Sequence, residues 1–398
     1  MAFTRPWRRS LSVVVGLSAS VAPVRAQTPS PSVSTGFGVD TTITDVGNIV
    51  ALVRAYLAAP DTSARSRGLW TTSTDFDRRI GDITAGQTYQ GFPATVVGVV
   101  SVPSNDSLYV VKIMYARADS AEGIAPLALQ RLYAIRDGSS RFRFKLASAF
   151  PRVTKDWERR TKGPITFTYA PTQRPNQARI DSAARFVDSV ATMFDVSQPE
   201  HLEVVVGPSM DEVERAIGMD FFVEPSGPGQ RSGGRNFGSI LLVGNPAIGE
   251  AYYHEFVHAV LGPHIRAGTQ LLAEGVATWL GGSRGRTPLE MYTAVHRYQL
   301  EDSTLTFSGL FRKGFTDPDA LRASDLLYGT GALIAHGVYE KQGIARLRNL
   351  YQTSGDADTI LRAIARSLDL PINDGGALDR WWRAEAAQLS SRPTNTIR

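Results

Sequence analysis

The chain of 398 residues contains no cysteine. This absence excludes disulfide scaffolds, thiolate zinc sites, iron–sulfur clusters and cysteine nucleophiles. Histidine is also scarce, with six in the whole chain. Hydrophobic residues make up 42% of the sequence and charged residues 20%, which excludes a disordered chain and predicts ordinary globular domains. The length predicts two or more domains, each able to bury a core.

An excess of one charge is also missing once the first residues are set aside. The formal net charge is +5, but the first 26 residues hold four arginines and no acidic residue or lysine. The remainder carries 39 basic side chains against 38 acidic ones. No basic arm is left to neutralise a phosphate backbone, so the sequence argues against a nucleic-acid partner.

Long hydrophobic runs are absent as well. Outside the N-terminal 26 residues no apolar run reaches the roughly 18 residues that a transmembrane helix needs. Residues 1–26 combine a positive start (Arg5 and the Arg8-Arg9 pair), an apolar stretch at 11–21 and small residues before a cleavage position after Ala26. This pattern predicts a secretory signal peptide and an exported protein, periplasmic or secreted, by the Sec or the twin-arginine route.

The sequence predicts an α+β fold whose first part is small. Residues 27–38 are rich in Pro and Ser and predict a linker. Within 39–150, one helical apolar face is followed by four strand-like runs, and Asp137-Gly138 predicts a hairpin between the last two. The helix is expected at 46–57, and the strands at 94–102, 108–116, 129–136 and 142–148. One helix on a mostly antiparallel sheet is similar to the nuclear-transport-factor-two-like fold.

The second part, residues 163–398, predicts a short mixed sheet followed by helices. Strand patterns fall at 164–170, 202–206 and 239–243, and helical patterns at 176–194 and 210–217. Ser209, with Glu212 three residues on, predicts the cap of the second of these helices. Beyond Asn245 the pattern is helical to the end.

The segment His254-Glu255-Phe256-Val257-His258 carries the most specific signal. Residues four apart lie on one face of a helix, so the two imidazoles can bind one metal ion. Glu255 lies beside the first imidazole and is placed to take a proton from a metal-bound water. The alternative is a helix with two half-exposed histidines, which its many apolar neighbours disfavour.

A third ligand is expected from the apolar segment 271–280. Glu274 is the one acidic residue there, and a carboxylate among Leu, Ala and Val needs a positive partner. Gly262-Pro263 ends the preceding helix, so the chain can turn and bring this second helix alongside. The alternative is a solvated carboxylate on an amphipathic face.

A His-Glu-x-x-His helix followed by a Glu-Gly-x-Ala helix resembles the gluzincin-type zinc metallopeptidases of the peptidase MA-like superfamily. The resemblance covers residues 164–389. It implies one catalytic Zn²⁺ held by His254, His258 and Glu274, with Glu255 as the catalytic base.

Leu327-Tyr328-Gly329-Thr330-Gly331 also resembles the Tyr-x-x-Gly motif of aminopeptidase N-like gluzincins. The resemblance implies that the Tyr328 hydroxyl stabilises the oxyanion, while a buried core tyrosine is the alternative. Two departures stand out. The Gly-x-Met-x-Asn exopeptidase signature is absent, which favours an endopeptidase, and Ala273 precedes the glutamate where many relatives have Asn.

Four other residues and one strand are further candidates. His264 is expected on a surface loop, while His296 and His336 on later helices are alternatives to Tyr328 as oxyanion donor. Asp325 is expected to cap a helix. By resemblance, strand 239–243 is expected at a sheet edge that binds an extended peptide, or else in the core.

The sequence thus predicts an exported zinc metallopeptidase that hydrolyses peptide bonds through a metal-activated water, with peptide or protein substrates. A zinc-stabilised, catalytically inactive binding or scaffold protein is the alternative. A small-ligand pocket in the N-terminal domain is a third interpretation, which no polar cluster supports. The oligomeric state does not follow from the sequence.

Overall fold

The computed structural model describes residues 33–59, 68–71, 92–103, 105–119, 123–223, 233–372, 374 and 376–392. The predicted signal peptide at 1–26 and the first six residues of the predicted linker lie outside these ranges. Helices and two mixed sheets make up the described part, which confirms the α+β class. None of the described helices combines the length and apolarity that crossing a bilayer requires.

The N-terminal half is built on a six-stranded sheet covered by one helix. The strands run in the order β1-β2-β3-β4-β5, with β9 also paired to β4. They are β1 (Val33–Thr35), β2 (Ala94–Val102), β3 (Asn105–Asp119), β4 (Gly123–Arg136), β5 (Phe144–Ala147) and β9 (Met219–Phe222). Helix α1 (Thr44–Leu57) buries Ile49, Val50 and Val53 in the core that it shares with this sheet. The expected helix and strands are all present, and Asp137 lies in the turn between β4 and β5.

The predicted linker contains a strand. Residues 33–35 form β1, which pairs with β2 in parallel, so that part of the segment is ordered by backbone hydrogen bonds rather than being a spacer. A short helix, α4 (Phe150–Val153), follows β5. The similarity to a nuclear-transport-factor-two-like domain stays a prediction.

The second sheet lies in the middle of the chain and leads into the predicted metal-binding helix. Its order is β10-β11-β8-β7-β6. The strands are β6 (Glu158–Lys162), β7 (Ile165–Tyr169), β8 (Leu202–Val206), β10 (Gly234–Asn236) and β11 (Ile240–Val243). Strands β7, β8 and β11 are parallel, and the edge strands β6 and β10 are antiparallel to their neighbours. Two helices accompany it: α5 (Gln177–Met193) and α6 (Met210–Ala216), capped by Ser209 as expected.

One expectation about this sheet is wrong. The strand at 239–243 is not an edge strand, because β11 is hydrogen-bonded to β8 on one side and to β10 on the other. All four of its residues are buried, so the core alternative holds. On this side of the sheet the edge strand is β10, whose three residues are too few and too polar to indicate a strand.

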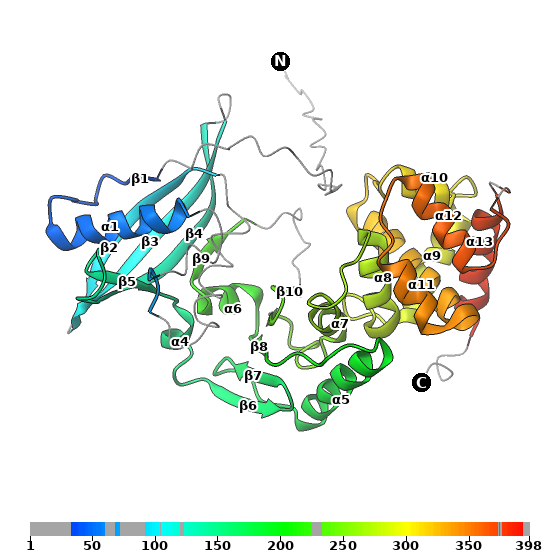
Figure 1. Ribbon diagram of the computed structural model, residues 1–398, viewed down its shortest axis with the longest axis horizontal. Helices are drawn as coiled ribbons and strands as arrows, with labels where there is room; N and C mark the ends of the chain where they lie inside the picture. The colour runs from blue at the N-terminus through cyan, green and yellow to red at the C-terminus, as the bar shows by residue number, and fades with distance from the viewer. Residues whose placement is uncertain are drawn as a thin grey trace, which may run out of the picture.

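The rest of the described chain is helical. The helices are α7 (Tyr253–Leu261), α8 (Gln270–Gly281), α9 (Pro288–Glu301), α10 (Phe307–Arg312), α11 (Ala320–Tyr351), α12 (Ala357–Ser367) and α13 (Ala377–Ser390). In Figure 1 the helices α8 to α13 gather at one end of the molecule, the N-terminal sheet with α1 lies at the other end, and the second sheet lies between them. Helix α7 follows that sheet directly and packs against both α5 and α8.

The two halves share strands and core residues. Strand β9 comes from the second half of the chain yet pairs with β4 of the first sheet. Val205, Ile240 and Leu242 of the second sheet lie in the same hydrophobic core as α1. The predicted division into domains at 39–150 and 163–398 stays a prediction, and the packing crosses it.

Candidate metal centre

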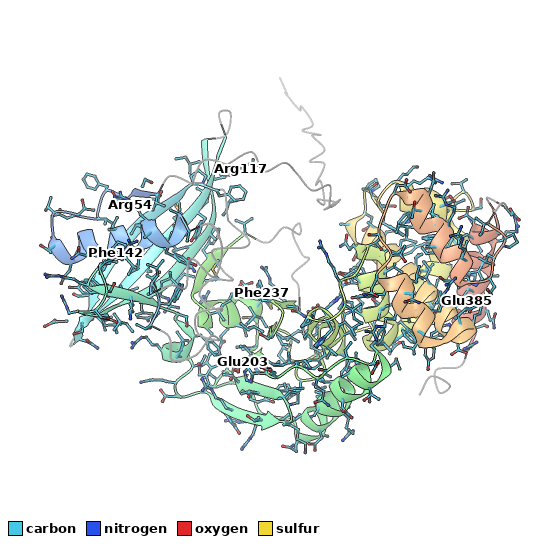
Figure 2. All side chains as sticks on the ribbon, viewed as in Figure 1. Arg54, Arg117, Phe142, Glu203, Phe237 and Glu385 are labelled. Carbon is cyan, nitrogen blue, oxygen red and sulfur yellow. The ribbon has the colours of Figure 1, made fainter. Side chains whose placement is uncertain are left out.

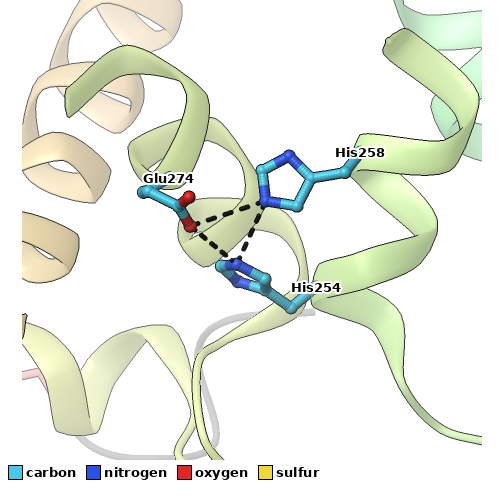
Figure 3. Close-up of side chains that lie close together, drawn as sticks. All are labelled: His254, His258 and Glu274. Carbon is cyan, nitrogen blue, oxygen red and sulfur yellow. Dashed lines mark hydrogen bonds and ion pairs between the residues drawn. The ribbon is translucent and has the colours of Figure 1, made fainter. Parts of the chain in front are cut away.

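Helix α7 presents two imidazoles on one face because Phe256 and the aliphatic residues that follow it are buried against the core. Phe256, Val257 and Val260 are at most 1% exposed and pack in the core beneath the second sheet. This fixes the rotation of the helix about its axis, so His254 and His258, one turn apart, lie together on the same face of the helix. Figure 3 shows the two rings directed toward one point.

Helix α8 brings the carboxylate to the same point. Its N-cap is Thr269, whose hydroxyl accepts a hydrogen bond from the backbone N–H of Leu272. The helix ends against α7 at Gly281, where a Cβ atom would lie 2.5 Å from the backbone nitrogen of His254. That close approach lets Glu274 reach the imidazoles from the neighbouring helix (Figure 3).

The three ligand atoms form a nearly regular triangle. His254 Nε2 lies 3.1 Å from Glu274 Oε2 and 3.3 Å from His258 Nε2. The third side, from His258 Nε2 to Glu274 Oε2, is 3.5 Å. A tetrahedral zinc with bonds of about 2.0–2.1 Å holds its ligand atoms about 3.3–3.4 Å apart. The triangle therefore fits zinc, and two imidazoles with one carboxylate leave a fourth position for water or substrate.

The carbonyl of Gly282 fixes the orientation of the first imidazole. His254 Nδ1 lies 2.8 Å from that oxygen, which can only accept a hydrogen bond, so Nδ1 carries the proton. In the neutral imidazole that binds a metal, the lone pair of Nε2 then faces the other two ligand atoms. A backbone acceptor behind a histidine is the usual arrangement at metal sites, and it makes the imidazole a better ligand.

Electrostatics at the triangle favour ionised Glu274. Burial pushes the pKa of Glu274 upward, but the hydrogen bonds and charges of His254 and His258 outweigh it and lower that pKa below its ordinary value. Burial acts to lower the pKa of His258. The interaction of His258 with the Glu274 carboxylate outweighs burial and raises the pKa of His258 above its ordinary value. The carboxylate is thus in the charged form that a metal ion requires.

The structure brings Tyr328 to this cluster. Its ring lies nearly parallel to the His254 ring, with a centroid separation of 5.6 Å. Burial and the charges of Glu274 and Glu255 raise the pKa of Tyr328, so its hydroxyl keeps its proton and can donate a hydrogen bond. Tyr328 is therefore next to the triangle of candidate metal ligands, on the first half of α11.

Glu255 lies half-buried at the same place. Its charge acts on Tyr328 and on Tyr252, and burial together with a hydrogen bond to Glu255 raises the pKa of Tyr252. The backbone carbonyl of Glu255 accepts a hydrogen bond of 3.0 Å from the side-chain amide of Asn236 on β10. The edge strand of the second sheet is thus tied to the start of α7.

Among the other candidates, the histidines lie in different surroundings. His264 is exposed between α7 and α8, as expected. His336 Nδ1 lies 3.4 Å from a carboxylate oxygen of Glu385 on α13, and Figure 2 labels Glu385 among the C-terminal helices. His296 is half-buried on α9, and its Nδ1 has no partner among the residues that the structure describes.

The expectation that Asp325 caps a helix is wrong. The cap of α11 is Asp319, whose carboxylate accepts hydrogen bonds from the backbone of Leu321 and Arg322. Asp325 lies more than a turn inside the helix and is 1% exposed. Arg284 and Arg286, from the loop between α8 and α9, pair with its carboxylate.

Three residues near the triangle were not singled out by the sequence: Tyr252, Arg284 and Asn236. The only signal for Tyr252 is its position two residues before His254. Arg284 and Asn236 are distant in sequence from the residues they contact, by 41 and 19 positions, so no local spacing predicts those contacts.

Comparison with known proteins finds similarity in structure only. No protein-family model matches the chain, and no curated protein matches its sequence. A two-domain M1 zinc metallopeptidase bound to L-tryptophan is similar over 74% of this chain, with 14% identity and a TM-score of 0.35. An M1 zinc metallopeptidase from Deinococcus radiodurans has 14% identity over 74% of this chain and a TM-score of 0.33. The matched part spans 62% of the length of each of these structures.

Proposed function

We propose that this chain is a zinc-dependent peptidase that hydrolyses internal peptide bonds. The observation that carries the proposal is the triangle of His254, His258 and Glu274, whose sides of 3.1–3.5 Å match tetrahedral zinc. A zinc ion bound there would polarise the scissile carbonyl and lower the pKa of a coordinated water. Two further groups beside the triangle, Glu255 and Tyr328, supply what hydrolysis needs besides the metal.

Glu255 is the proton carrier in this proposal. Glu255 directly follows His254, the first ligand, in the sequence. Its charge raises the pKa of Tyr328, whose ring stacks on His254. It accepts a proton from the attacking water and delivers it to the nitrogen of the leaving amine. One carboxylate can do both, because the amine becomes basic as the peptide bond breaks.

Tyr328 is the oxyanion donor. Its pKa is raised, so the hydroxyl stays protonated and donates a hydrogen bond to the carbonyl oxygen as negative charge develops there. The parallel stacking on His254 holds the ring beside the reacting carbonyl. An extended substrate would align along the edge strand β10, which Asn236 ties to α7, rather than along β11. We also propose that the protein acts after export and removal of residues 1–26.

The test is the Glu255→Gln variant. Glutamine keeps the size and helix propensity of glutamate but cannot accept the proton. We expect kcat on a peptide library to fall by about 10²–10⁴-fold, with zinc content and melting temperature nearly unchanged. Glu340→Gln, an exposed glutamate of α11, is the matched control.

Two results would count against the proposal. Full hydrolysis by Glu255→Gln would assign the activity to another site or to a contaminant. A zinc-loaded wild-type chain that cleaves no peptide in the library would favour the inactive scaffold protein.

A further inference from the structure

A buried carboxylate fixes the loop between α8 and α9 onto α11. Asp325 accepts hydrogen bonds from Arg284 Nη2 at 2.5 Å, from Arg286 Nη1 at 3.1 Å and from the Tyr298 hydroxyl at 3.2 Å. Arg286 Nη2 donates to it as well. Four donors fill the lone-pair positions of one carboxylate. The loop that holds the Gly282 carbonyl behind His254 is therefore anchored to the helix that carries Tyr328.

Arg286 alone is enough to neutralise the charge of the Asp325 carboxylate. Its guanidinium pairs with both carboxylate oxygens, which is the strongest geometry for such a pair. Arg284 contributes one nitrogen, and its Nε and Nη1 make no hydrogen bond with the residues that the structure describes. One carboxylate faces two guanidinium groups, so a positive charge remains on the more exposed arginine, Arg284, with 38% of its side chain exposed.

The backbone of Arg284 is strained. Its φ angle is +53°, a left-handed conformation that costs a residue with a Cβ atom about 1–2 kcal/mol. Glycine would remove that cost, and Gly285 beside it is also left-handed. Strain of this kind in a non-glycine residue concentrates at functional sites. The chain thus has an arginine at position 284 although glycine would avoid the conformational cost of this φ angle.

The guanidinium of Arg284 lies beside the metal centre. Its Cζ atom is 5.6 Å from the centroid of the Tyr328 ring, which is itself 5.6 Å from the His254 ring. The positive charge acts on the Tyr328 hydroxyl, where it opposes the rise in pKa. An extended peptide advances about 3.3–3.6 Å per residue. Arg284 therefore lies within about three residues of extended peptide from the His254 ring.

We propose that Arg284 binds a carboxylate of the substrate, so that peptides carrying a carboxylate within three residues of the scissile bond are preferred. The inference rests on the proposed peptidase function and names its substrate class. The carboxylate comes either from an acidic side chain or from the C-terminus of a short peptide. A planar guanidinium whose Nε and Nη1 make no hydrogen bond with the described residues can recognise either one.

The test uses four versions of one peptide: Glu or Gln two residues after the cleaved bond, each with a free or an amidated C-terminus on the next residue. We expect kcat/KM to be about 10–100-fold higher for at least one carboxylate version than for the Gln amide, the range for a hydrogen bond to a charged group. The Glu amide and the Gln acid distinguish the side chain from the C-terminus as the source.

The Arg284→Gln variant should bring the carboxylate-to-amide ratio close to one, and Arg284→Lys should restore part of it. Arg312→Gln is the matched control, since it removes one exposed positive charge that pairs with Asp358 rather than Asp325, and it should keep the ratio. Equal loss on all four peptides in Arg284→Gln would make Arg284 a clamp residue only and overturn the inference.

Binding measured by calorimetry separates this inference from the proposed function. The zinc-loaded Glu255→Gln chain should bind the carboxylate peptides more tightly than the Gln amide. Adding Arg284→Gln should abolish that preference. If wild type cleaves no peptide but this preference is found, the peptidase proposal fails and Arg284 is still a carboxylate site. If cleavage occurs and binding shows no preference, the inference about Arg284 is wrong.

Discussion

Gly275 of α8 and Gly331 of α11 face one another with no side chain between them. A Cβ atom on Gly275 would lie 2.4 Å from the carbonyl carbon of Gly331, and one on Gly331 would lie 2.3 Å from the carbonyl oxygen of Leu271. Glu274 immediately precedes the first glycine, and Tyr328 lies nearly one turn before the second. Direct contact between the two backbones therefore places the carboxylate of the candidate metal centre and the tyrosine at the same site.

Gly331→Ala should push α8 and α11 apart. We expect a loss of about 1–3 kcal/mol in the free energy of unfolding, because the added methyl group meets backbone atoms that cannot rotate away. Denaturant unfolding measures this. Gly138→Ala is the control, since no atom lies within 4 Å of a Cβ there. Equal stability of the two variants would contradict the close contact.

Glu274→Gln should remove the metal. The amide has no charge to offset that of zinc, and we expect the affinity to fall by more than about 100-fold. Metal content after dialysis, measured by elemental analysis, reports the change. Glu301→Gln replaces an exposed glutamate of α9 and should keep wild-type zinc content. Unchanged metal in Glu274→Gln would remove this residue from the ligand set.

Tyr328→Phe should slow catalysis without removing zinc. Loss of one oxyanion donor costs about 10²–10³-fold in kcat, and KM should change less. The control on the same helix is Tyr339→Phe, whose ring packs 4.9 Å from that of Trp279. If Tyr328→Phe turns over at the wild-type rate, the oxyanion donor is a different group and Tyr328 serves packing alone.

Local patterns in two separate helices were enough to predict the three candidate metal ligands. His254, His258 and Glu274 lie together as expected, because apolar neighbours fix which face of α7 and α8 is buried. Their roles, and that of Glu255, stay predictions until measured. Asp325 was misassigned because its burial depends on arginines 39 and 41 residues earlier, which no local spacing reveals.

The sheets show the same limit. Long alternating or apolar runs predicted β2, β7 and β8, whereas β6 and β10 were missed, since charged or glycine-containing residues at a sheet edge lack the strand pattern. Strands β6 and β10 form because each is hydrogen-bonded to a neighbouring strand, β7 and β11 respectively. The same holds for β1, which sits in a segment with the composition of a linker.

Strand β9 couples the stability of the N-terminal sheet to the stability of the candidate metal centre. Its pairing with β4, and the core that α1 shares with β8 and β11, mean that neither half can unfold while the other keeps its buried surface. A ligand that binds only the folded state stabilises every segment that unfolds with it. Zinc added to the metal-free chain should therefore slow amide hydrogen exchange in β4, whose residues contribute no ligand to the metal.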